Sequence, residues 1–133
     1  MSEPATPTTS IDTLRAEVLA PITPKLATLT PAIGELATSF AYGQVWSRTE
    51  LCPRDRSIAT IAALVAINCH DELKLHVLRG LTNGLTKQEV GEIILQLTPY
   101  VGFPLTVSAA AAVGDVVERA DISKPTSGAA SGK

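Results

Sequence analysis

The chain has 133 residues, of which 45% are hydrophobic and 18% charged, and its formal net charge is −2. This length gives room for one domain with its own core and not for two. Basic residues are scattered along the chain, which excludes the electrostatic footprint of a protein that binds nucleic acid or anionic lipid. We therefore expect a single globular domain with neither nucleic-acid nor membrane partners.

Cysteine usage and hydropathy place the protein in a reducing compartment. Cys52 and Cys69 are too few for a disulfide scaffold and have no metal-ligand spacing. Residues 1–9 lack the apolar segment of a signal peptide, and the longest apolar stretch, 58–67, is about half the length of a bilayer span. We expect a soluble, cytoplasmic protein without a metal site.

Proline, glycine and capping residues divide the chain into helices. Low-complexity tails are predicted over residues 1–10 and 123–133, on either side of a helical domain over 11–122. No segment alternates with a period of two for long enough to form a strand, so the predicted class is all-α, a compact bundle of about six helices. In chain order, the helices are predicted over residues 11–19, 31–46, 53–68, 71–83, 87–100 and 104–119.

Local signals fix several of these boundaries. Thr30-Pro31 is typical of an N-cap followed by proline at the first helical position, and Pro53 can open the next helix in the same way. Asn83-Gly84 is a C-cap pair, and Thr86-Lys-Gln-Glu89 is a capping box. The segment 58–67 is apolar on every face, which predicts a helix at the centre of the bundle.

One helix carries a polar stripe that is a candidate for catalysis. Glu72, His76, Arg79 and Asn83 are spaced by four, three and four residues and so share a helical face. A glutamate one turn before a histidine can accept a hydrogen bond from the ring and raise its basicity, which prepares a general acid or base. On periodicity alone, the stripe is equally open to interpretation as a solvated face.

A basic loop precedes the apolar helix. Arg48, Arg54 and Arg56 lie near the start of that helix, where positive charge opposes the helix dipole, and this indicates carboxylate partners from protein or substrate. Trp46 is expected to anchor the core or a subunit contact.

These segments together resemble the carboxymuconolactone decarboxylase family. The resemblance covers residues 35–118 and rests on five motifs in the correct order. They are Phe40-Ala-Tyr-Gly-Gln-Val-Trp-Ser-Arg48, Leu51-Cys-Pro-Arg-Asp-Arg-Ser57, Glu72-Leu-Lys-Leu-His76, Asn83-Gly-Leu-Thr-Lys-Gln-Glu-Val-Gly-Glu92 and Tyr100-Val-Gly-Phe-Pro104.

The resemblance implies an alkylhydroperoxidase-D-like fold assembled as a homo-oligomer, a trimer or a hexamer, with active sites near subunit contacts. The peroxidase branch of that superfamily has a C-x-x-C pair before the histidine. Here the stretch is Cys69-His-Asp-Glu72, which keeps the first cysteine and replaces the second by Glu72. Without a resolving thiol, dithiol turnover is excluded at this place. Whether Cys69 has a chemical role stays open.

The resemblance also implies a reaction: decarboxylation of a small carboxylated lactone or related conjugated molecule, without a cofactor. His76 is then expected to deliver the proton to carbon, with Glu72 orienting its ring. Arg48 or Arg56 is expected on a second carboxylate or the enolate, because an arginine on the departing carboxylate would stabilise the ground state. Trp46 and Tyr100 complete the expected substrate-binding set.

Two other functions stay open from the sequence. The same acid/base pair suits a cofactor-free isomerase, lactone-opening or cyclising enzyme of a secondary-metabolite pathway, because each needs enolate stabilisation and proton transfer. A non-catalytic oligomeric binding protein on the same fold is the second alternative.

Overall fold

The computed structural model describes residues 4–5 and 7–123, and nearly all of this part is helical. The predicted all-α class is confirmed. In chain order the elements are β1 (Thr9–Ser10), α1 (Ile11–Leu19), α2 (Thr23–Leu29), α3 (Pro31–Leu36), the π-helix η1 (Ala37–Val45), α4 (Pro53–Ala66), α5 (His70–Thr82), α6 (Lys87–Val101), α7 (Phe103–Arg119) and β2 (Ala120–Asp121).

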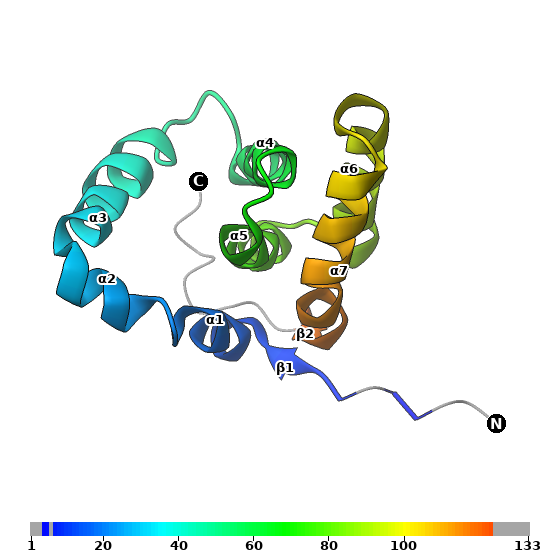
Figure 1. Cartoon of the computed structure of the whole chain (residues 1–133), viewed down its shortest axis with the longest axis horizontal. Helices are drawn as coiled ribbons and strands as arrows, with labels where there is room; N and C mark the ends of the chain where they lie inside the picture. The colour runs from blue at the N-terminus through cyan, green and yellow to red at the C-terminus, as the bar shows by residue number, and fades with distance from the viewer. Residues whose placement is uncertain (1–3, 6, 124–133) are drawn as a thin grey trace.

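Helix α5 lies at the centre of the bundle. It packs against α1, α4, α6 and α7 (Figure 1), and its Leu73, Val77 and Leu78 are fully buried. The prediction that the apolar segment 58–67 is central is wrong, because α4 packs with one face only. The opposite face of α4 is exposed, and Ile67 just after it is 69% exposed. An all-apolar helix therefore still has a side away from the core of this chain.

An arm of three short helices, α2, α3 and η1, curves away from the bundle (Figure 1). Its helices pack mainly on one another, and none of them contains a buried residue. Helix α2 was not predicted, and the helix predicted over 31–46 is α3 continued as the π-helix η1. Trp46 N–H donates to the Ala41 carbonyl at 2.8 Å, an i→i+5 bond that brings this wide helix to its end.

The predicted caps explain where the bundle helices begin and end. The capping box at α6 is present, because Glu89 N–H donates to the Thr86 hydroxyl and Thr86 N–H donates to the Glu89 carboxylate, both at 3.0 Å. Asn68 ends α4 with a φ of 58°, a left-handed conformation that asparagine tolerates. Gly102, at φ 93°, makes the turn between α6 and α7.

The two ends of the described domain are tied together. Thr9 and Ser10 pair in parallel with Ala120 and Asp121, so part of the predicted 1–10 tail forms a strand. Residues 124–133 of the predicted C-terminal tail lie outside the described residues. Arg119 at the end of α7 donates to both carboxylate oxygens of Glu17 on α1 at 3.1 Å. These contacts hold α1 in place beside α5.

Across the described ranges, none of the helices combines the length and the apolar character that a membrane span requires.

Candidate active site

His76 lies on α5 under the C-terminal end of the arm. Its side chain is only 12% exposed. The indole of Trp46, the residue that ends η1, stacks on the imidazole with ring centroids 6.0 Å apart and planes 21° apart. The polar stripe is therefore not a solvated face at His76, although Glu72, one turn earlier, has a half-exposed side chain.

The two ring nitrogens of His76 have different surroundings. Nδ1 is buried and has no hydrogen-bond partner among the described residues. Nε2 lies 4.0 Å from a carboxylate oxygen of Glu72, which is beyond hydrogen-bond distance. A buried polar atom without a partner costs about 1–3 kcal/mol, so Nδ1 is a feature that stability alone does not explain.

The charge state of His76 is set by burial and by two arginines. Burial lowers the pKa of His76 from its ordinary value of 6.5 to about 4, and the positive charges of Arg79 and Arg15 lower it further in the same direction. This direction is opposite to the raised basicity expected from Glu72. The Glu72 carboxylate is half-exposed and makes no hydrogen bond to the ring, so solvent screens its charge. In this environment His76 is neutral at neutral pH.

Aromatic rings and a guanidinium form the wall of the site next to His76. The guanidinium carbon of Arg79 lies 4.3 Å from the ring centroid of Tyr42 and 5.7 Å from that of Trp46. Both distances are within the range of cation–π attraction. Tyr42 and Trp46 also contact each other, with centroids 5.9 Å apart. The arm thus supplies two aromatic rings, and α5 supplies the histidine and one arginine.

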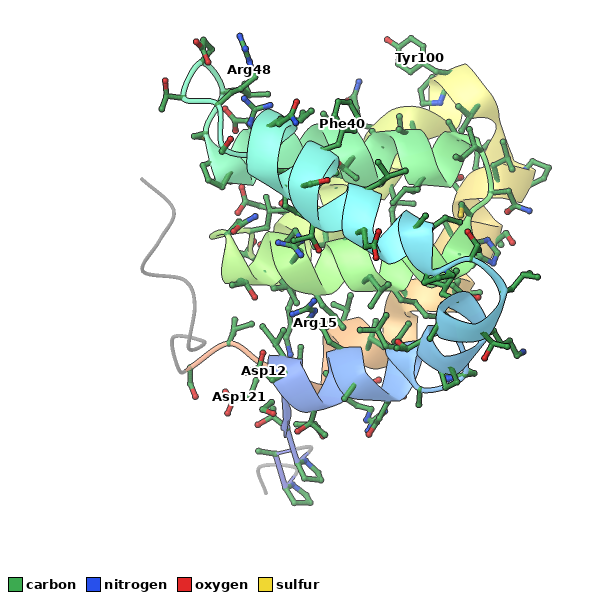
Figure 2. All side chains as sticks on the ribbon, turned by 90° about the vertical axis from the view of Figure 1, so that its left-hand side faces the viewer. Asp12, Arg15, Phe40, Arg48, Tyr100 and Asp121 are labelled. Atoms are coloured by element: carbon green, nitrogen blue, oxygen red, sulfur yellow. The ribbon has the colours of Figure 1, made fainter. Side chains whose placement is uncertain are left out.

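Arg15 is the second arginine near His76, and sequence reasoning did not single it out. It is half-buried on α1, and Figure 2 shows it rising from α1 toward α5. The only signal in the sequence was its place next to Leu14, on the flank of the face that α1 buries. That signal could not say which helix the face would meet.

The predicted substrate-binding arginines lie elsewhere. The Arg48 side chain is 62% exposed and lies 3.7 Å from Glu50. Arg56 donates to the backbone carbonyls of Leu51 at 3.0 Å and Arg48 at 3.2 Å, and so holds the loop before α4. Arg54 forms an ion pair with Glu89. Within the described residues no contact joins these arginines to His76.

Tyr100 is also placed away from the histidine. It is 77% exposed near the end of α6, and in Figure 2 Tyr100 and Arg48 project from the edge of the molecule far from Arg15. Of the predicted site residues, the structure brings together His76, Glu72 and Trp46. It does not bring Arg48, Arg56 or Tyr100 to them.

Asn83, the last residue of the polar stripe, has a structural contact. Its side-chain amide donates to the hydroxyl of the fully buried Ser57 at 3.0 Å, which joins the end of α5 to α4. Cys52 and Cys69 are free thiols. Among the described residues, no three His, Cys, Asp or Glu side chains are grouped so that they could hold a metal ion.

Comparison with known proteins gives a consistent family. Residues 31–115 match the carboxymuconolactone decarboxylase family. The chain is 44% identical over 70 residues to 4-carboxymuconolactone decarboxylase of Acinetobacter baylyi, which covers 53% of this chain and 52% of that protein. It is 30% identical over 95 residues to nitrosuccinic acid decarboxylase of Metarhizium robertsii, covering 68% of this chain and 66% of that protein. The chain thus spans about half to two thirds of these relatives' lengths. Arg15 precedes the matched residues.

Proposed function

The chain belongs to the carboxymuconolactone decarboxylase family, and on that premise we propose that it is a cofactor-independent decarboxylase of a carboxylated lactone or a related conjugated small molecule. The observation that carries this proposal is His76, a titratable group sheltered by Trp46, with a buried ring nitrogen that no described residue satisfies. The names of both relatives support loss of CO2 as the reaction.

The surroundings of His76 suit the chemistry of decarboxylation. When CO2 leaves, the electron pair of the broken bond remains on the substrate, and a conjugated carbonyl takes it up as an enolate. The protein must then exclude water and deliver one proton to carbon. Tyr42 and Trp46 supply apolar walls, and His76 is the buried titratable group beside them.

His76 must carry a proton when the new C–H bond forms. A neutral imidazole is far too weak an acid to protonate carbon, so the donor is the imidazolium. Glu72, 4.0 Å from Nε2, is placed to favour that positive form when the ring charges. In the protein alone, however, the balance of burial and Arg15 and Arg79 favours the neutral ring.

We further propose that the protein works as a homo-oligomer, a trimer or a hexamer, in the cytoplasm. Support comes from the apolar side chains that the chain exposes on the arm, among them Leu36 and Phe40, at 61% and 57% exposure. The free thiols of Cys52 and Cys69 fit a reducing compartment.

The reaction class is tested by counting CO2. The purified chain is incubated with 4-carboxymuconolactone and, separately, with nitrosuccinic acid, and released CO2 is compared with substrate consumed, with and without a chelator. We expect one CO2 for each substrate molecule and no effect of the chelator. Consumption without CO2 would instead support the isomerase or lactone-opening alternative. No consumption above the uncatalysed rate would support the binding protein.

A further inference from the structure

Arg15 and Arg79 reach His76 from helices that are distant in the sequence. Arg79 follows His76 on α5, and Arg15 comes from α1, which packs against α5. Both arginines are half-buried. Two positive charges beside a buried imidazole are unfavourable in themselves, because each disfavours protonation of the ring and repels the other.

These two arginines differ from the others in the chain in how their guanidinium groups are used. Among the described residues, neither Arg15 nor Arg79 forms an ion pair or donates a side-chain hydrogen bond, and Arg79 is held only by the faces of Tyr42 and Trp46. The remaining arginines all have partners: Arg48 with Glu50, Arg54 with Glu89, Arg56 with the carbonyls of Leu51 and Arg48, and Arg119 with Glu17 and Asp115.

A half-buried guanidinium without a carboxylate is a binding group for an anion. Guanidinium donors recognise carboxylates with short, charge-assisted hydrogen bonds. The carboxylate bound here cannot usefully be the one that departs, because tight pairing would stabilise the ground state more than the transition state. The arginines therefore fit a second carboxylate, which stays on the substrate throughout the reaction.

We propose that Arg15 and Arg79 together bind the carboxylate that the substrate retains, and that this anion, seated beside His76, brings a solvent proton onto the imidazole before CO2 leaves. The substrate class is then a dicarboxylate. This inference rests on the proposed decarboxylase function and names both its substrate class and the source of its proton.

The proton balance closes over one turnover. Binding of the dianion is accompanied by one proton from solvent, which protonates His76. The C–C bond to the departing carboxylate breaks, CO2 leaves, and the electron pair passes to the conjugated carbonyl. The proton then moves from His76 to carbon, and the ring returns to its neutral form. One solvent proton is consumed for each CO2 released.

The charged groups around His76 allow this coupling. Glu72 and Arg79 face it from α5 and Arg15 faces it from α1, while η1 contributes the rings of Tyr42 and Trp46. The basic side chains of the two other helices packed on α5 are engaged elsewhere: Arg54 and Arg56 of α4 with Glu89 and with backbone carbonyls, and Arg119 of α7 with Glu17 and Asp115. An anion between Arg15 and Arg79 would cancel the positive charges that oppose protonation.

The test uses succinate, a simple dicarboxylate that need not react. Side-chain NMR of the full-length chain follows the titration of His76, assigned by the signal lost in His76→Gln. In the free protein we expect His76 to titrate at about 4. Saturating succinate should raise this pKa by about one unit or more, and calorimetry in buffers of different ionisation enthalpy should show proton uptake on binding at pH 5 to 6.

Variants identify the arginines as the cause. Arg15→Gln and Arg79→Gln should each raise the pKa of His76 in the free protein and weaken succinate binding about tenfold or more. Arg15→Lys keeps the charge, so the low pKa should persist while binding weakens, which keeps the test valid if a glutamine variant misfolds. Lys74→Gln removes one positive charge from the same helix, away from His76, and should change neither property.

Three results would overturn the inference: no shift of His76 with tens of millimolar succinate, unchanged succinate affinity in both arginine variants, or an equal effect of Lys74→Gln. None of these measurements depends on turnover. A chain that binds succinate with proton uptake but releases no CO2 would refute the proposed function and leave the arginine site standing. CO2 release with no role for Arg15 or Arg79 would do the reverse.

Discussion

The His76 side chain combines burial with positive neighbours, and both act in the same direction on its charge. Desolvation removes the water that would stabilise an imidazolium, and Arg79 and Arg15 repel it. The nearby Glu72 is too exposed to offset them. A residue with this environment is held neutral until another anion arrives, and it carries that property into the stability of the folded chain.

The depressed pKa of His76 predicts a pH dependence of stability. His76 binds its proton at about 4 in the folded protein but near 6.5 in the unfolded chain. As the pH falls, the unfolded chain therefore takes up this proton first. The stability associated with neutral His76 is present above pH 6.5 and is lost as the pH falls toward 4, by roughly 1–2 kcal/mol at pH 5.

Urea unfolding at pH 7.5 and pH 5 measures this effect. Between these pH values, the free energy of unfolding should fall further for the wild type than for His76→Gln, in which the ring is absent. Other groups titrate alike in both proteins, so their effects cancel in the difference. Equal pH dependence in the two proteins would contradict the predicted environment of His76.

Single residues in the site were predictable to different degrees. Glu72 and His76 could be selected because helical spacing places them on one face. Trp46 was only expected as an anchor, and its stacking on His76 depends on how the arm closes over α5. Arg56 was selected for its charge, but the chain uses that charge on its own loop carbonyls. Charge reveals that a group needs a partner and not which partner it finds.

Helices with strong local signals were predictable from the sequence, and the arm was not. The capping box of α6 and the end of α5 at Asn83 follow from side chains that bond to nearby backbone, so they need no tertiary information. Helix α2 has no side-chain cap at Ile22 and no buried face. The π-helical hydrogen bonds of η1 have no sequence signature of comparable strength.

The exposed apolar side chains of the arm predict self-association. Leu36 and Phe40 lie on elements with no buried residues, although both are large and apolar. Light scattering at micromolar concentration should give a mass three or six times 13.9 kDa. Leu36→Glu combined with Phe40→Glu should shift the mass toward that of one chain, because each substitution places a charge in the contact.

Lys25→Glu provides the matched control, because it adds negative charge at an exposed polar position of the same arm. This variant should keep the wild-type mass. A wild-type protein of 13.9 kDa in solution, or an unchanged mass for the double variant, would rule out an oligomer formed through the arm.

The whole molecule brings together groups that no local pattern connects. Sixty-one positions separate Arg15 from His76, and they meet because α1 packs on α5 while Arg119 and the short β1–β2 pair tie the two ends of the domain together. The fold class followed from periodicity, but the second arginine of the site follows only from this packing. The same packing placed α5, and not the more apolar α4, at the centre.

The central claim is that His76 delivers the proton in a decarboxylation, and His76→Ala tests it most directly. On the substrate that the wild type turns over, this variant should lower kcat by about two to four orders of magnitude, the usual contribution of general acid catalysis. Its melting temperature and oligomer mass should stay close to wild type, because the ring packs against Trp46 and satisfies no buried group. Glu72→Gln should lower kcat less. A His76→Ala variant with near wild-type kcat, or one that loses assembly while the remaining folded enzyme keeps its turnover, would contradict this role.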